Sequence, residues 1–191
     1  MRTFLAIDLD EIIVESLRHE SLQLQEEIPD KWVKWVKPES IHLTLKFLGE
    51  IKPEFIGQVE ELVDPIVVDT PEMIMKIGGF GAFPNFNRPR VLWVGVDEET
   101  GALETLHAKL QSAFEQIGFE AERRSFTPHL TLGRVKRGFS KGDQADLVER
   151  LRRVEINSLG RLEADGLTLF ESKLGPGGAS YRAVREFTFR G

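Results

Sequence analysis

The tetrapeptide His-Leu-Thr-Leu occurs twice in the chain, at residues 42–45 and at residues 129–132. Each copy lies in a run that predicts a β-strand, residues 40–47 and residues 128–135. Because side chains alternate between the two faces of a strand, the His and the Thr of each copy share one face and the two Leu share the other. Each strand therefore anchors itself in a core with its leucines and presents an imidazole and a hydroxyl on the opposite side.

The length and composition bound the class of protein. With 191 residues, of which 41% are hydrophobic, the chain suits one domain or two small lobes that share an interface. It has no cysteine, which excludes disulfides, thiolate zinc sites, iron–sulfur clusters and a cysteine nucleophile. The net charge of −6 argues against non-specific coating of nucleic acid, but it allows a local basic pocket that binds one phosphate or one strand end.

No apolar run in the sequence approaches the ~20 residues that a membrane-spanning helix needs. The first ten residues predict a strand rather than a signal peptide, because their apolar run is short and includes two early acids. We therefore expect a cytoplasmic protein with no membrane partner, and a monomer as the default.

The order of predicted elements repeats along the chain. Each half, about residues 1–80 and 88–172, follows the order strand, helix, motif strand, helix, strand. This repetition predicts an α+β fold in one bilobal domain over residues 1–191, with two pseudo-symmetric lobes. The predicted elements are 2–9, 10–27, 40–47, 53–66 and 73–77 in the first half, 90–96, 99–117, 128–135, 143–153 and 164–172 in the second, and a final strand at 181–189.

Glycine and proline mark the predicted connections. Residues 78–81, 84–85 and 88–89 are expected to form the loop between the halves. Gly175-Pro176-Gly177-Gly178 is typical of a hairpin turn between the last two strands.

Two facing motif strands would form a pocket with two imidazoles and two hydroxyls. A phosphodiester can be opened without a metal ion if one imidazole removes a proton from the attacking group while the other donates one to the leaving oxygen. An imidazole has an unperturbed pKa of about 6.5, so both forms are available near neutrality. Threonine hydroxyls can donate hydrogen bonds to the non-bridging oxygens. The other two histidines, His19 and His107, fall in predicted helices, so the candidate catalytic residues are His42, Thr44, His129 and Thr131.

Four segments carry a resemblance to a known family. They are residues 2–7, residues 35–49 around the first motif, Gly79-Phe80-Gly81-Ala82-Phe83-Pro84, and residues 128–134 with the second motif. Together they resemble the RNA 2′,3′-cyclic phosphodiesterase branch, also called 2′-5′ RNA ligase, of the 2H phosphoesterase superfamily. The resemblance covers nearly the whole chain. It implies two lobes of antiparallel sheet, with helices on the outside and an active-site cleft between the sheets.

The resemblance also implies a reaction on an RNA 3′ end or a cyclic nucleotide. Water attacks the phosphorus of a 2′,3′-cyclic phosphate, the bond to O3′ breaks, and a 2′-phosphate remains, without a cofactor or a metal ion. By this resemblance His42 matches the proton donor to O3′, and His129 matches the base that activates water. Thr44 and Thr131 match the phosphate-binding hydroxyls. The two motifs are nearly identical, so the residues alone leave the order of the histidine roles open.

Arg134 is a further candidate, because a guanidinium suits phosphate oxygens. Simple alternation places it on the face opposite His129 and Thr131. A β-bulge at Gly133 would turn its side chain to their face. The alternative is a surface arginine at the end of a strand.

Aromatic and basic residues near the motifs are candidates for RNA contacts. Trp35 lies among lysines just before the first motif, where it could stack on a base. The alternative is an edge strand with its tryptophans in the core. Phe47 could form a wall of the pocket or pack in the core. The pair at 123–124, Arg123 and Arg124, could attract an anion or be solvated surface charge.

Other functions are weaker matches to the residues. The run 138–142, Gly-Phe-Ser-Lys-Gly, fits the nucleophile-elbow pattern, but the parallel α/β series that the elbow requires is absent. A metal site at His42 and His129 lacks a third ligand. Two alternatives to hydrolysis remain: joining of the cyclic phosphate end to an RNA 5′-hydroxyl, and a non-catalytic module that binds RNA ends.

Overall fold

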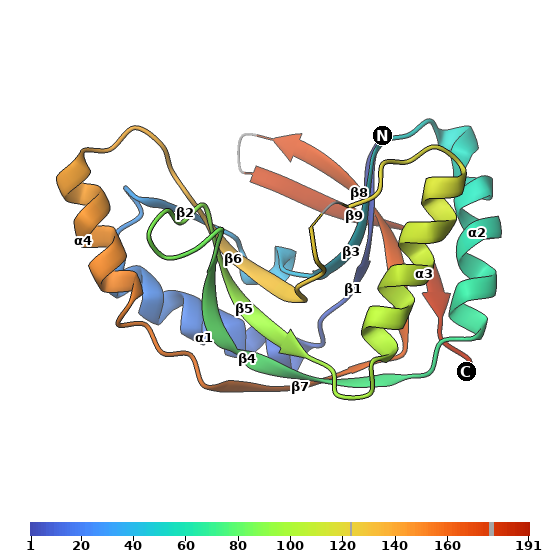
Figure 1. The fold of residues 1–191 in the computed structure, drawn as a ribbon, viewed down its shortest axis with the longest axis horizontal. Coiled ribbons are helices and arrows are strands. Elements are labelled where there is room, and N and C mark those ends of the chain that lie inside the picture. Colours follow the sequence, from blue (N-terminus) through green and yellow to red (C-terminus); the bar gives the residue numbers. More distant parts are fainter. Residues whose placement is uncertain (123, 176–177) are drawn as a thin grey trace.

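The computed structural model describes residues 1–122, 124–175 and 178–191. Arg123 and the centre of the expected hairpin turn, residues 176–177, lie outside the described residues. Two antiparallel sheets form two lobes (Figure 1). The first sheet has the strand order β3 (Leu43–Glu50), β1 (Arg2–Ile7), β8 (Gly166–Gly175), β9 (Gly178–Thr188), and the second has the order β2 (Val33–Trp35), β6 (His129–Val135), β5 (Val91–Asp97), β4 (Met73–Phe83), β7 (Ser158–Ala164).

The described part of the chain has four α-helices, which lie on the outside of the two sheets or at their end (Figure 1). In the first lobe α3 packs on β3, and α2 packs on both α3 and β9. In the second lobe α1 packs on β7, and α4 lies at the far end of the sheet. The helices are α1 (Glu11–Glu27), α2 (Ile56–Val68), α3 (Ala102–Gln116) and α4 (Lys141–Leu151), and two 3₁₀ helices are η1 (Pro38–Ser40) and η2 (Pro53–Phe55).

Local sequence explains where these helices begin and which face they bury. The carboxylate of Asp10 accepts a hydrogen bond from the Ile13 amide at 2.8 Å and caps α1. Ser140 caps α4 by accepting from the Asp143 amide at 3.1 Å, so the segment 138–142 is a helix start and not a nucleophile elbow. In α3 the buried residues recur at helical spacing and pack against the sheet. They are Leu103, Leu106, Leu110 and Phe114.

Each sheet combines strands from both halves of the chain. β4, from the first half, pairs with β5 and β7, and β8, from the second half, pairs with β1. The two halves therefore fold around one another rather than as separate lobes. Figure 1 shows the α+β architecture that the sequence predicts, with antiparallel sheets inside and helices outside.

The glycine-rich segment 78–81 is the clearest error of the sequence prediction. The sequence predicts a loop there, but the segment continues β4 as far as Phe83. Its glycines are explained by close packing: a Cβ at Gly78 would lie 2.6 Å from the Asn157 carbonyl oxygen, and Gly79 has a φ of 76° at a bulge in the pairing with β5. The prediction also misses β7, whose alternation is weak.

The motif leucines lie in the core. Leu43, Leu45, Leu130 and Leu132 are all at most 3% exposed. Since the helices cover this face of each sheet, the His and Thr face of each motif strand is turned to the space between the sheets (Figure 1). Among the described residues, no helix is long and apolar enough to span a bilayer.

Candidate active site

Both motif strands carry a β-bulge at the same place in the motif. In β3, Thr44 pairs with Ala6 and Lys46 pairs with Leu5, so Leu45 is the extra residue. In β6, Thr131 pairs with Trp93 and Gly133 pairs with Leu92, so Leu132 is the extra residue. A bulge of this kind places two consecutive side chains on one face and reverses the alternation beyond it.

The bulges bring Phe47 and Arg134 to the face that carries the motif histidines and threonines. Phe47 pairs with Phe4, which shares a face of β1 with Ala6, the partner of Thr44. Arg134 follows the bulge in β6, and its charge acts on His129. The sequence suggests a bulge at Gly133; the structure has it one residue earlier, at Leu132, and it reverses the parity that simple alternation gives for Arg134.

Aromatic rings surround His42 in the first lobe. Its imidazole stacks on Phe4 with centroids 4.5 Å apart, and Tyr181 meets it edge-on at 4.9 Å. Phe170 and Phe47 extend the same cluster through Phe4, at 5.3 and 5.9 Å. Burial among these rings lowers the pKa of His42 to about 4, and a hydrogen bond to the backbone of Ser40 opposes the shift.

His129 has a related environment in the second lobe. Its Nδ1 lies 2.7 Å from the carbonyl oxygen of Thr127. A carbonyl can only accept, so Nδ1 donates the proton and Nε2 keeps a lone pair for chemistry. Burial lowers the pKa of His129, and the charge of Arg134 lowers it further, while the bond to Thr127 opposes both. Each motif histidine thus bonds to the backbone of the residue two positions before it.

An indole lies beside His129 on the same face of the sheet. Trp93 pairs with Thr131, and its ring centroid is 6.2 Å from that of His129. The ring occupies the space over Gly81, where a Cβ would lie 2.1 Å from the indole Cζ2. Phe83 contacts both rings, at 5.1 Å from Trp93 and 4.8 Å from His129. The absence of a side chain at residue 81 is therefore what makes room for Trp93.

Trp35 is not on this face. It pairs with Gly133, whose other partner is the buried Leu92, and a Cβ at Gly133 would meet Val33 Cγ1 at 2.7 Å and Trp35 Cε3 at 3.1 Å. Trp35 therefore packs toward the core of the second lobe, which is the alternative to base stacking that the sequence left open. Lys34, which lies between Val33 and Trp35 in β2, pairs with Arg134 and lies on the same face of the sheet as Arg134.

The other two histidines lie on helices and not on the motif strands. His19 is exposed on α1, and His107 stacks on Phe126 at 3.8 Å. Arg124 is exposed. Lys46 is 4% exposed on the opposite face of β3, where it donates to the Glu120 carbonyl at 2.8 Å.

Several residues that complete the site are not predicted from the sequence. Their common signal is strand alternation, but their relation to the histidines depends on pairing between distant strands. They are Phe4, Gly81, Phe83, Trp93, Phe170 and Tyr181.

The family model of LigT-like phosphoesterases matches the chain twice, over residues 12–93 and 94–181. The chain belongs to the LigT-like phosphoesterase family. A family member of Archaeoglobus fulgidus, named RNA 2′,3′-cyclic phosphodiesterase, is 36% identical over 187 residues, which cover 98% of this chain and 99% of that protein. One of Methanocaldococcus jannaschii with the same name is 34% identical, with 98% and 100% covered.

The fold of this LigT-like phosphoesterase is also that of solved structures. A crystal structure of a Thermus thermophilus protein superposes with a TM-score of 0.78 at 27% identity, and the match covers 100% of this chain and 99% of that one. Among the described residues, no group of three or more His, Asp or Glu side chains is placed to hold a metal ion.

Proposed function

We propose that this LigT-like phosphoesterase hydrolyses the 2′,3′-cyclic phosphate at an RNA 3′ end and leaves a 2′-phosphate. One observation carries the proposal: two partly buried imidazoles, on facing sheets, are each tied to a backbone group two residues earlier. The names of the relatives, RNA 2′,3′-cyclic phosphodiesterase, support the same substrate.

His129 is the proposed base. With Nδ1 bonded to the Thr127 carbonyl, its Nε2 removes a proton from water as the oxygen attacks phosphorus. Burial, with a smaller contribution from the charge of Arg134, lowers the pKa of His129 and favours the neutral imidazole in the free protein, so the base is ready before substrate binds.

His42 is the proposed acid. In the free protein its low pKa leaves it neutral at pH 7. A bound phosphate anion favours the charged imidazolium, so the substrate itself raises the pKa of His42 and prepares the proton donor. As the P–O3′ bond breaks, His42 transfers its proton to O3′. His42 takes up that proton from solvent when the substrate binds, and after the reaction His129 releases to solvent the proton it removed from water. The net reaction therefore consumes one water molecule, and both imidazoles are neutral again.

The other residues of the motif faces stabilise the charge and hold the nucleotide. Thr44 and Thr131 donate hydrogen bonds to the non-bridging oxygens, where charge builds up in the transition state. Arg134 adds a guanidinium beside the same oxygens. Phe47, 60% exposed, offers its ring to the base. Two imidazoles supply both proton transfers, so the reaction requires neither a metal ion nor a cofactor.

The test is hydrolysis of an RNA with a 2′,3′-cyclic phosphate end in the presence of EDTA. We expect turnover by the wild type and a fall of about 10²–10⁴-fold in kcat for His42→Ala and for His129→Ala. His19→Ala, on the exposed face of α1, is the matched control and keeps wild-type turnover. Mapping of the product gives the phosphate on the 2′ oxygen. A 3′-phosphate product, turnover that EDTA abolishes, or full activity without either motif histidine would overturn the proposal.

A further inference from the structure

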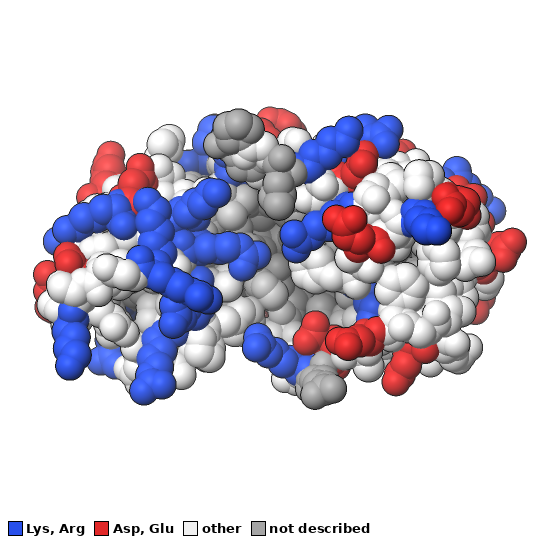
Figure 2. Space-filling view, turned by 90° about the horizontal axis from the view of Figure 1, so that it is seen from above, with Lys and Arg blue, Asp and Glu red and all other residues white. Residues whose placement is uncertain are grey.

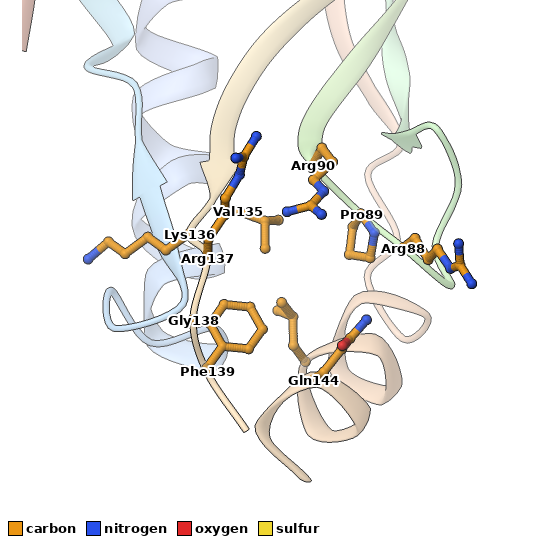
Figure 3. Close-up of a pocket in the computed structure, with 10 residues that line it drawn as sticks. Arg88, Pro89, Arg90, Val135, Lys136, Arg137, Gly138, Phe139 and Gln144 are labelled. Carbon is orange, nitrogen blue, oxygen red and sulfur yellow. The ribbon is translucent and has the colours of Figure 1, made fainter. Parts of the chain in front are cut away.

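A basic pocket lies at the end of the second sheet, outside the motif faces. It has a volume of about 390 Å³ and lies between the ends of β5 and β6 and the first turns of α4 (Figure 3). The side chains that matter for its chemistry are Arg88, Arg90, Lys136, Arg137, Phe139 and Gln144.

The backbone connects this pocket directly to the candidate active site. β6 carries Thr131 and Arg134, and the next residues of the chain line the pocket. The amide of Val135 donates to the carbonyl of Arg90 at 3.0 Å, which holds the two sides of the pocket together. Lys34 pairs with Arg134 on the neighbouring strand β2, so two cations lie between Thr131 and the pocket.

The positive charge of the pocket is not neutralised by neighbours. Arg88, Arg90, Lys136 and Arg137 are exposed, and none forms an ion pair with any residue in the described part of the chain. The whole chain has a net charge of −6, so this concentration is local. Figure 2 shows Lys and Arg gathered over one lobe, beside the hollow between the lobes. On the other lobe Asp and Glu are interspersed with Lys and Arg.

The directions of Arg90 and Phe139 fit a phosphate and a base, whereas Lys136 and Arg88 extend away from the pocket (Figure 3). In Figure 3 the guanidinium of Arg90 points into the pocket, the side chain of Arg137 runs back along β6, and the ring of Phe139 lines the wall opposite Arg90. Guanidinium groups bind phosphate oxygens in a bidentate manner. An aromatic ring among cations is the arrangement that binds single-stranded nucleic acid by stacking.

We propose that the basic pocket binds the backbone phosphate of a nucleotide upstream of the cyclic phosphate end, on the same RNA strand. The inference rests on the proposed function and adds a second binding site for the same RNA strand. From Thr131 to Lys136 the strand advances about 16 Å, at about 3.3 Å per residue. A stacked strand carries a phosphate about every 3.4 Å, so the pocket is reached within about five nucleotides, and within fewer if the strand is extended.

The pocket would therefore make the enzyme prefer RNA ends over mononucleotides. The test compares kcat/KM for a 2′,3′-cyclic mononucleotide with that for a six-nucleotide RNA that ends in the same cyclic nucleotide. In the wild type we expect kcat/KM for the oligonucleotide to exceed kcat/KM for the mononucleotide by at least about tenfold. This ratio should fall as the salt concentration rises. The double variant Arg90→Glu/Arg137→Glu should lower this ratio by about tenfold or more.

A matched control separates this pocket from overall charge. Lys109→Glu/Arg190→Glu makes the same change in net charge on the opposite lobe, and its ratio should stay at the wild-type value. An equal loss of ratio in this control, or no loss in the pocket variant, would overturn the proposal.

The salt dependence is a second measurement that needs no charge reversal. Each phosphate contact contributes about −0.7 to the slope of log(kcat/KM) against log salt for a single strand. Arg137→Gln should make the slope for the oligonucleotide shallower by roughly that amount. Identical slopes for oligonucleotide and mononucleotide in the wild type would contradict the pocket.

The two proposals fail in different ways. If the wild type hydrolyses neither substrate, the proposed function is wrong, and fluorescence anisotropy with a 3′-phosphorylated hexanucleotide still tests the pocket. Weaker binding by Arg90→Glu/Arg137→Glu than by the control double variant supports the pocket, and equal binding by the two contradicts it.

Discussion

Phe47 and Arg134 occupy the same position on the two motif strands, five residues after the histidine, and both lie on the face of the histidine. The bulges at Leu45 and Leu132 give the two strands the same geometry, but the residue delivered to the site differs. On the His42 side it is an apolar ring, and on the His129 side it is a cation. A nearly symmetric scaffold thus presents different chemistry on its two sides. Under the proposed function the ring contacts the base and the cation contacts the phosphate.

The ring of Phe47 should contribute to binding of the nucleotide. Stacking of a base on an aromatic ring is worth about 1–3 kcal/mol, so Phe47→Ala should raise KM for a cyclic mononucleotide by about 5- to 150-fold. Phe47→Tyr keeps the ring and should restore most of the loss. Ile12→Ala, which removes an exposed apolar side chain from α1, is the control. An unchanged KM for Phe47→Ala would show that the base binds elsewhere.

Arg134 should hold down the pKa of His129 in the free protein. Removal of its charge in Arg134→Gln takes away one of the two effects that lower this pKa, so the pKa rises toward 6.5. The measurement is an NMR titration of the His129 imidazole without ligand. The control is Arg161→Gln, on β7, which should leave the pKa of His129 unchanged. A His129 pKa that falls in Arg134→Gln is incompatible with the geometry of the bulge.

The pH dependence of catalysis should reflect two histidines that burial keeps neutral. Because the pKa of His42 is lowered to about 4 and that of His129 is also lowered, both limbs of the kcat/KM profile should lie below pH 6.5. The profile of kcat should lie at higher pH, since bound phosphate raises both pKa values. The check is both profiles on a cyclic mononucleotide, whose phosphate does not titrate in this range. A maximum of kcat/KM above neutrality would contradict it.

The same burial should make stability depend on pH. The folded protein binds a proton at His42 less tightly than the unfolded chain does. The contribution of neutral His42 to the free energy of unfolding is therefore complete above pH 6.5 and is lost as pH falls toward 4. Between these limits the free energy of unfolding should fall by about 3 kcal/mol on account of this residue. Urea unfolding at pH 7.5 and at pH 4.5 should show a drop in the wild type that is much smaller in His42→Gln. His19→Gln, at an exposed position, should retain the wild-type drop.

Gly81 should tolerate no side chain. A methyl group there would overlap the Trp93 indole and push it toward His129. We expect Gly81→Ala to lower the free energy of unfolding by about 1–3 kcal/mol and to reduce kcat. Gly57→Ala is the control, because nothing lies within 4 Å of a Cβ at that position of α2, and it should be neutral or slightly stabilising. The measurements are the thermal unfolding and the kcat of Gly81→Ala and Gly57→Ala. Equal stability and equal kcat in the two variants would exclude crowding of Trp93 by a side chain at residue 81.

The sequence by itself determined the parts of the site that depend on a local property of the backbone. Alternation along a strand puts His42 with Thr44 and His129 with Thr131, and the burial of the intervening leucines shows that this alternation holds. The helix starts at Asp10 and Ser140 also follow from neighbouring residues alone.

Only the tertiary structure decided which face the later residues of each motif take. A bulge is a relation between a strand and its partner, so Phe47 and Arg134 acquire their place from β1 and β5, which lie far away in the sequence. Trp35, by contrast, is turned to the core by its pairing with Gly133. The low pKa of His42 likewise comes from rings on three other strand segments, because desolvation depends on what the fold brings around a group and not on its neighbours in the chain.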